Sequence, residues 1–308
     1  MTRRPIFRRT GAHTGSRRIS ILILTGVVAA LSVMVAVRFV DKDDDSASID
    51  PNAAYGVAHV HGLGVNPADG TLIVATHNGS FRVAADGDDA ERIGDSLQDT
   101  MGFTVTGADQ FLGSGHPDLA GRRAGQPVQL GLVESTDGGA TWRGVSLGGE
   151  VDFHALVHRH DQVYGWDASS GRLMVSMNRV DWQTRSTLDL NGFAVDPGDA
   201  EHLVAAAPEG LLESGDGGRT WSPADGPQLV TLSWDQSAGL WGADAAGGVY
   251  VLRSSTWSRT GTVPGQPEAF LVTPNRIYAA AVNTDGVTGI YMSVDGSTWD
   301  LLYADRAP

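Results

Sequence analysis

The chain lacks cysteine, and its C-terminal five-sixths lack lysine. The absence of cysteine among 308 residues excludes disulfide bonds, thiolate chemistry and anchoring through a lipidated cysteine. Beyond residue 52 there is no lysine, and 14 arginines stand against 31 acidic residues, a balance of −17. Such a surface repels phosphate backbones, so we expect no nucleic acid partner. The acidity itself is typical of a soluble exported domain.

Long apolar runs are also scarce, and the one present lies near the N-terminus. Ile19 to Val37 is almost wholly apolar, follows six arginines and precedes an acidic stretch. As a helix it would span about 28 Å, enough to cross a bilayer. The charge bias predicts a cytoplasmic basic segment over residues 1–18, a transmembrane signal-anchor over 19–40 and an acidic linker over 41–55. We therefore expect a single-pass protein of the cell membrane whose C-terminal domain is extracytoplasmic.

A cleaved signal remains the alternative to this anchor. Ser16, Arg17 and Arg18 resemble the start of a twin-arginine export signal. A signal peptide also needs small residues at a cleavage site, and no convincing small-x-small site follows the apolar run.

An eight-residue turn sequence recurs along the rest of the chain. It reads Ser-Gly-Asp-Gly-Gly-Arg-Thr-Trp from Ser214 to Trp221, and it recurs from Ser135 to Trp142 and, one residue shorter, from Ser293 to Trp299. The aspartate can accept hydrogen bonds from amides of its own turn, and the glycines permit positive φ. Counting weaker copies, the repeat is marked by Glu91, Trp142, Trp182, Trp221, Trp257 and Trp299.

Spacings close to 40 residues, filled by short strands, predict propeller blades. The fold class is therefore all-β: a six-bladed β-propeller over residues 56–308. Each blade is expected to have four strands with the turn sequence between the third and fourth. The predicted first strands begin near Gly62, Gly102, His154, Gly192, Thr231 and Ala269. The predicted second strands begin at Leu72, Phe111, Val163, Leu203, Leu240 and Ile277.

These turn sequences resemble those of the Asp-box, or BNR-repeat, β-propellers, which include sialidases, other glycoside hydrolases and non-enzymatic binding proteins. The phrase from His59 to Pro67, with Ala75 to Gly79, resembles bacterial exported proteins labelled exo-alpha-sialidase or glycosyl hydrolase-like. The resemblance implies boxes on the face opposite the usual ligand site. A sialidase would also need an arginine triad, and no arginine lies between Asp41 and Phe81. Another glycosidase would need a carboxylate pair, and the acidic residues near predicted strand ends are Asp99, Asp118, Asp152, Asp167 and Glu268. Of these, Asp152 and Asp167 are the candidate pair.

Histidine is concentrated in the first three blades. Aligned blades bring the start of each first strand and the end of each second strand to one face. When blades 1 and 2 are aligned, His61 and Met101 occupy equivalent positions, and so do His77 and His116. His154 reaches the same face only through a β-bulge. Imidazoles with a thioether favour copper, or zinc with less help from the thioether. The predicted metal ligands are His59, His61, His77, Met101, His116 and His154.

The sequence thus predicts a membrane-tethered monomer with a binding or metal-handling site on blades 1–3, holding a copper or zinc ion. A histidine-lined pocket for a small organic ligand or glycan is the alternative at this site, and purely structural histidines are the third. A glycoside hydrolase on the same face and an assembly scaffold are the other functional hypotheses.

Overall fold

The computed structural model describes residues 56–84 and 89–304. The predicted basic segment, signal-anchor and acidic linker lie outside the described residues, as do residues 85–88 before Glu91. Among the described residues, no helix has the length and hydropathy of a membrane span.

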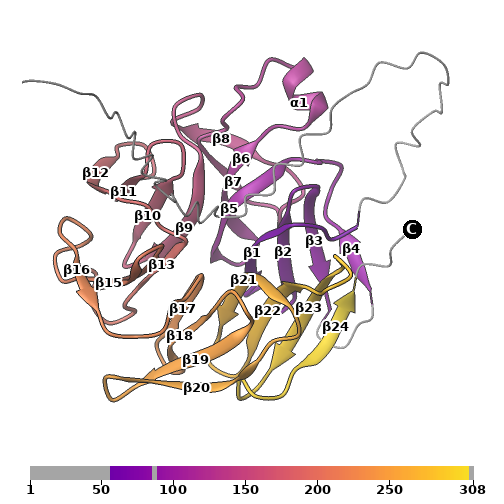
Figure 1. Ribbon diagram of the computed structural model, residues 1–308. Helices are drawn as coiled ribbons and strands as arrows, with labels where there is room; N and C mark the ends of the chain where they lie inside the picture. Colours follow the sequence, from indigo (N-terminus) through magenta and orange to yellow (C-terminus); the bar gives the residue numbers. More distant parts are fainter. Residues whose placement is uncertain (1–55, 85–88, 305–308) are drawn as a thin grey trace, which may run out of the picture. The chain divides into compact units, whose positions relative to one another are not determined.

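Six four-stranded antiparallel sheets are arranged around a common centre (Figure 1). Each sheet consists of four strands that are consecutive in sequence, so the predicted six-bladed β-propeller is confirmed. Blade 1 is β1 (Val60–Val65), β2 (Leu72–Thr76), β3 (Gly79–Val83) and β4 (Ala90–Arg92). Blade 2 is β5 (Asp99–Gly107), β6 (Gln110–His116), β7 (Leu132–Ser135) and β8 (Arg143–Ser146). Blade 3 is β9 (Phe153–Arg159), β10 (Gln162–Asp167), β11 (Arg172–Ser176) and β12 (Gln183–Thr187).

The other three blades follow the same plan. Blade 4 is β13 (Gly192–Val195), β14 (Leu203–Ala207), β15 (Gly210–Ser214) and β16 (Ser222–Ala224). Blade 5 is β17 (Thr231–Asp235), β18 (Gly239–Ala243), β19 (Gly248–Arg253) and β20 (Thr256–Thr262). Blade 6 is β21 (Gln266–Val272), β22 (Ile277–Val282), β23 (Thr288–Ser293) and β24 (Asp300–Ala304). The short helix α1 (Leu119–Arg123) lies in the connection between β6 and β7.

Strand direction defines two faces of the propeller. We call upper the face where each first strand begins and each second strand ends. Because neighbouring strands are antiparallel, each third strand ends at the opposite, lower face. The boxes that begin at Ser135, Ser214 and Ser293 directly follow third strands, so they lie on the lower face.

The core consists of apolar clusters between neighbouring blades. Phe103 and Phe111 of blade 2 pack with Ile73 and Ala75 of blade 1, and Trp142 covers this cluster. Trp221 of blade 4 packs in the same way against the cluster it shares with blade 3. Trp142 and Trp221 therefore each lie between two sheets and join a turn to the body through apolar burial.

The box turns are closed by their own side chains. Asp216 Oδ1 accepts hydrogen bonds from the amides of Arg219 and Thr220, at 3.0 and 2.9 Å. The hydroxyl of buried Ser214 accepts the amide of Gly218 at 2.9 Å. Asp137 accepts the Thr141 amide at 2.9 Å. These bonds satisfy turn amides that no strand partner reaches.

Candidate functional site

Irregular strand pairing at the upper face places the residues of the site. Near the start of β1, β5, β9 and β21 one residue has no partner on the second strand. These residues are His61, Met101, His154 and Glu268. A bulged residue bends its strand and re-aims its side chain. His61, His154 and Glu268 all line one cavity of about 610 Å³ formed mainly by the first strands. The bulge that His154 needed is therefore present, and it makes His154 equivalent to His61.

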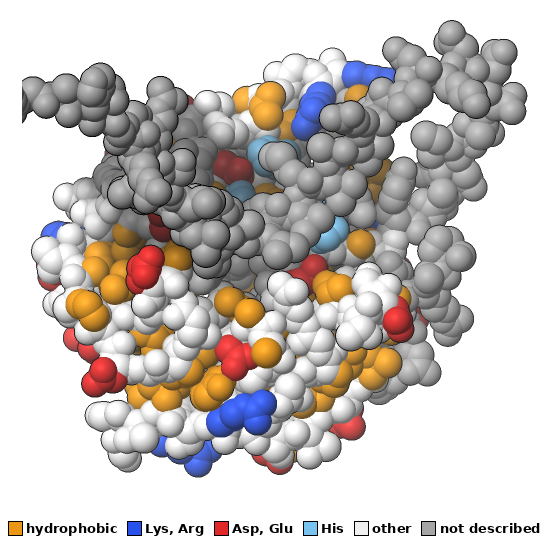
Figure 2. All heavy atoms as spheres, in the orientation of Figure 1, with side chains coloured by type: hydrophobic (Ala, Val, Ile, Leu, Met, Phe, Trp, Pro, Cys, Tyr) orange, Lys and Arg blue, Asp and Glu red, His pale blue; other side chains and the backbone are white. Residues whose placement is uncertain are grey.

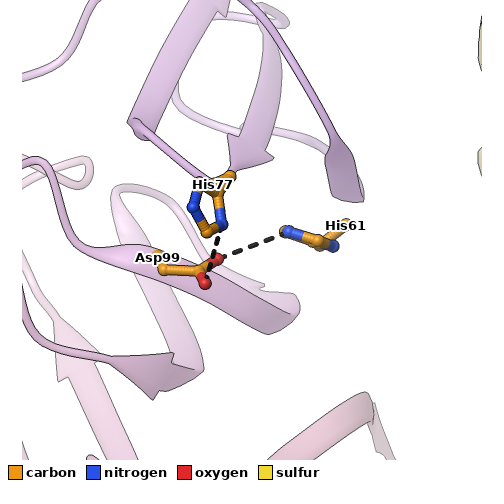
Figure 3. Close-up of side chains that lie close together, drawn as sticks. All are labelled: His61, His77 and Asp99. Atoms are coloured by element: carbon orange, nitrogen blue, oxygen red, sulfur yellow. Dashed lines mark ion pairs between the residues drawn. The ribbon is translucent and has the colours of Figure 1, made fainter. Parts of the chain in front are cut away.

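Two imidazoles from blade 1 converge on one carboxylate of blade 2, as Figure 3 shows. His61 Nε2 lies 3.3 Å from Asp99 Oδ1, and His77 Nδ1 lies 2.9 Å from Asp99 Oδ2. One donor atom from each residue can be chosen so that all three lie within 4.8 Å of one another. We call His61, His77 and Asp99 cluster 1. It spans the junction between blades 1 and 2.

Cluster 1 contains buried polar atoms without hydrogen-bond partners. Neither His61 Nε2 nor Asp99 Oδ1 has a hydrogen-bond partner among the described residues, although the two atoms face each other. Burial opposes ionisation of Asp99, but the imidazoles of His61, His77 and His116 outweigh it and hold the pKa of Asp99 below its ordinary value. An ionised carboxylate beside two nitrogen donors could hold a cation.

A second group of similar composition lies at the next junction. Asp152 Oδ2 is 3.0 Å from His154 Nε2 and 3.4 Å from His116 Nε2. The first distance is a hydrogen bond. We call His116, Asp152 and His154 cluster 2. Asp99 and His116 are cross-strand partners in blade 2, so the two clusters adjoin, and Figure 2 shows histidine and acidic side chains near one another on one face.

A third carboxylate enters the site from blade 6. Glu268 Oε2 accepts the Val60 amide at 3.1 Å, and Glu268 Oε1 lies 3.6 Å from His59 Nδ1. Burial raises the pKa of Glu268, and the Val60 amide and the imidazoles of His59 and His61 only partly oppose it. His59 itself has a positive φ of 52°, which few residues other than glycine adopt.

Asp167 has a structural environment. Its side chain is completely buried, and its Oδ1 accepts the amides of Asp152 and Ser169 at 3.0 and 3.2 Å. Arg172 and the hydroxyl of Ser170 bind the other oxygen. Asp167 therefore shapes the turn beneath Asp152 and positions that residue.

The predicted ligands thus divide into groups. His61 and His77 meet, but their shared partner is Asp99, whereas His116 joins His154 through Asp152. Met101 occupies the bulge of blade 2, and His59 pairs with Glu268. Asp99 and Glu268 are absent from the predicted metal ligands, although the sequence places both among the possible glycosidase carboxylates. Their signal in the sequence is their place at the start of a first strand, level with the histidines.

No protein-family model matches the chain, and no curated protein matches its sequence. Solved structures resemble it at low identity. The GH74 enzyme of Niastella koreensis is 16% identical with a TM-score of 0.55, covering 80% of this chain and 45% of its own. A gluconolactonase of Xanthomonas campestris is 16% identical with a TM-score of 0.58, covering 80% and 86%. A chain of the nidogen/laminin complex is 13% identical with a TM-score of 0.58, covering 76% and 93%.

These likenesses establish the class of fold. The chain is a six-bladed β-propeller, and it spans less than half the length of the GH74 enzyme it matches. On its upper face, imidazoles and carboxylates of adjacent blades meet.

Proposed function

We propose that this protein is an Asp-box propeller, tethered to the outer side of the cell membrane by residues 19–40, that binds a transition metal ion at cluster 1. The supporting observation is the pair of buried atoms, His61 Nε2 and Asp99 Oδ1, which face each other at 3.3 Å without hydrogen-bond geometry. A cation between them would satisfy both atoms.

The donor set indicates which ion would bind. Two imidazole nitrogens and one carboxylate oxygen suit Zn²⁺ or Cu²⁺, whereas Cu⁺ prefers sulfur donors. In a tetrahedral zinc site, bonds of about 2.0–2.1 Å place neighbouring donor atoms roughly 3.3 Å apart. In cluster 1 the two imidazoles lie 3.3 and 2.9 Å from different oxygens of Asp99, close to that spacing, so the carboxylate would use both oxygens or turn to present one. Three protein donors would leave one position for water or a ligand, as in a site that exchanges or activates a bound molecule.

The test is a zinc titration of the full-length protein, purified as a monomer in detergent and freed of metal with a chelator. We expect His61→Ala, His77→Ala and Asp99→Asn each to weaken the cluster 1 affinity by an order of magnitude or more. His202→Ala is the matched control, because both of its ring nitrogens already bond to Asp196 and Glu213 at 2.9 and 2.7 Å. Unchanged zinc binding in all three cluster 1 variants would overturn the proposal.

The membrane tether is tested separately. The full-length chain should resist extraction by alkaline carbonate, and removal of residues 1–40 should release it to the soluble fraction. Recovery of a shortened chain in the soluble exported fraction of wild-type cells would identify a cleaved signal in place of the anchor.

A glycoside hydrolase is the second candidate, because carboxyl groups with opposite pKa shifts lie on the same face. Such a pair can supply a general acid and an ionised partner. The pKa of Glu268 is raised by burial, and that of Asp99 is lowered by the surrounding imidazoles. This pair fits the roles better than Asp152 and Asp167, since Asp167 is enclosed. Hydrolysis of a neutral glycoside that is lost in both Glu268→Gln and Asp99→Asn would favour this candidate.

A further inference from the structure

We propose that cluster 2 is a second metal site, so that the protein holds two ions at successive blade junctions. The inference rests on the proposed metal-binding function of cluster 1. It departs from the sequence prediction, in which His61, His77 and His116 belong to one set of ligands for a single copper or zinc ion.

The hydrogen bonding of His116 supplies the first argument. His116 Nδ1 lies 2.9 Å from the carbonyl oxygen of Val128, in the connection that contains α1. A carbonyl can only accept, so Nδ1 carries the proton and the neutral ring keeps a bare lone pair on Nε2. Bonding of one ring nitrogen to a backbone carbonyl is the usual way in which proteins orient a metal-binding histidine.

The partner of this lone pair is itself an acceptor. His116 Nε2 faces Asp152 Oδ2 at 3.4 Å, and that oxygen already accepts the hydrogen bond from His154 Nε2. Two acceptors facing each other are unfavourable unless a proton or metal cation lies between them. The carboxylate also has spare capacity, because buried Asp152 Oδ1 has no hydrogen-bond partner in the described part of the chain.

The backbone that carries the Asp152 carboxylate is held in place. Its backbone amide donates to Asp167 Oδ1 at 3.0 Å, and the next amide, of Phe153, donates to Ser114 Oγ of blade 2 at 3.0 Å. Two imidazole nitrogens beside one carboxylate favour zinc or Cu²⁺ over an oxygen-seeking cation such as Ca²⁺. The donor atoms of cluster 2 do not all lie within 4.8 Å of one another, whereas those of cluster 1 do. An ion must therefore draw the two imidazoles together and replace the existing bond between His154 and Asp152, so cluster 2 should bind more weakly than cluster 1.

Blade 2 couples the two sites. It contributes Asp99 to cluster 1 and His116 to cluster 2, and these residues are directly opposed across β5 and β6. His116 is also among the imidazoles that lower the pKa of Asp99. Two dications on these residues would repel each other, so the second ion should bind less tightly than the first.

The experiment counts zinc ions bound by the full-length protein in detergent, by elemental analysis and by competition with a chromogenic chelator. We expect two ions in the wild type, one in His116→Ala, one in His77→Ala and none in the double variant. His154→Ala serves as a second probe of cluster 2, and His202→Ala should retain two ions. In the unaltered protein, two Cu²⁺ ions should broaden each other's electron paramagnetic resonance signals, which tests the proposal even if a variant fails to fold.

The possible outcomes separate the two proposals. Suppose that the wild type binds one ion, and that this ion is lost in His77→Ala but kept in His116→Ala and His154→Ala. This result would overturn the second site and leave the proposed function standing. If the wild type binds one ion and both His77→Ala and His116→Ala lose it, the two clusters form a single shared site. This result would also overturn cluster 2 as a separate site. A wild-type protein that binds no zinc or Cu²⁺ would overturn both.

Discussion

At the scale of single residues, the box aspartates show how one side chain stabilises a turn. The Thr220 amide leads a set of hydrogen bonds, with the Thr220 and Ser214 hydroxyls and the Arg219 amide, that lowers the pKa of Asp216 to about 2. The ionised carboxylate therefore stabilises the folded state above its unfolded pKa of 3.8. This contribution is lost as the pH falls toward 2.

We predict that Asp216→Ala lowers the melting temperature at pH 6 and that the difference from wild type shrinks as the pH is lowered to 3. Asp225→Ala is the control, since it removes the same charge from an exposed position in the same blade. Thermal melts of the three proteins across this pH range provide the measurement. Zinc binding should be unchanged, because the box lies on the lower face. A melting difference that grows toward acid pH would contradict the prediction.

The sequence predicted the donor residues of the upper face better than their grouping. Aligning the repeats identified His61, His77, His116 and His154, because histidine is rare elsewhere in the chain. The alignment identified Asp99 only as one of several carboxylates near strand ends and not as a partner of the histidines, since acidic residues are common along this chain and a single one carries little information. The hydrogen bond between His116 and Val128 also lies beyond sequence reasoning, because it depends on the path of the connection that contains α1.

At the scale of elements, the first strands approach one another closely around the centre. Gly102 of β5 shows this, since a Cβ atom at that position would lie 2.5 Å from the carbonyl oxygen of Phe153 in β9. Phe153 directly precedes His154, so the spacing of β5 and β9 also sets the position of cluster 2.

We predict that Gly102→Ala destabilises the protein by about 1–3 kcal/mol, because backbone must move to relieve the contact. Zinc binding at cluster 2 should weaken more than binding at cluster 1. Gly144→Ala is the matched control, since no other atom lies within 4 Å of a Cβ built there. Urea unfolding and zinc titration of both variants test this. Equal stability of the two variants would show that the strands adjust without cost.

The elements themselves were largely predictable. Apolar alternation and glycine-rich turns located the strands, and the predicted second strand at Leu72–Thr76 matches β2 to the residue. The bulges were not predictable, because a register shift depends on which partner amides are satisfied after the sheet forms. Because of the bulge at His154, this residue occupies the position in blade 3 that His61 occupies in blade 1. Alignment of the sequence repeats places His154 one residue further along its strand.

At the scale of the whole molecule, the ring of described strands closes without any strand of one end of the chain joining the sheet of the other end. Each blade is contiguous in sequence, so blade 6 and blade 1 are joined by packing between their sheets. Val60, Leu63 and Val74 of blade 1 share a buried cluster with Tyr278 and Ile290 of blade 6. Glu268 adds one polar link, through its bond to the Val60 amide.

The last prediction concerns this link in the metal-free protein. Burial raises the pKa of Glu268 above its unfolded value of 4.5, so the fold favours the neutral carboxyl. Stability linked to Glu268 is therefore full below pH 4.5 and is lost as the pH rises through the raised folded pKa. Glu268→Gln keeps an acceptor for Val60 without the charge. Its melting temperature should equal that of wild type near pH 4 and exceed it increasingly toward pH 7.

Glu268→Ala separates the bond from the charge. It leaves the buried Val60 amide without its acceptor, which should cost about 1–3 kcal/mol across the whole pH range. Melting temperatures of wild type and both variants between pH 4 and 7 distinguish the two effects. A constant difference between Glu268→Gln and wild type over this range would mean that the carboxyl is no harder to ionise in the ring than in the unfolded chain. Closure would then depend on the apolar cluster and the hydrogen bond alone.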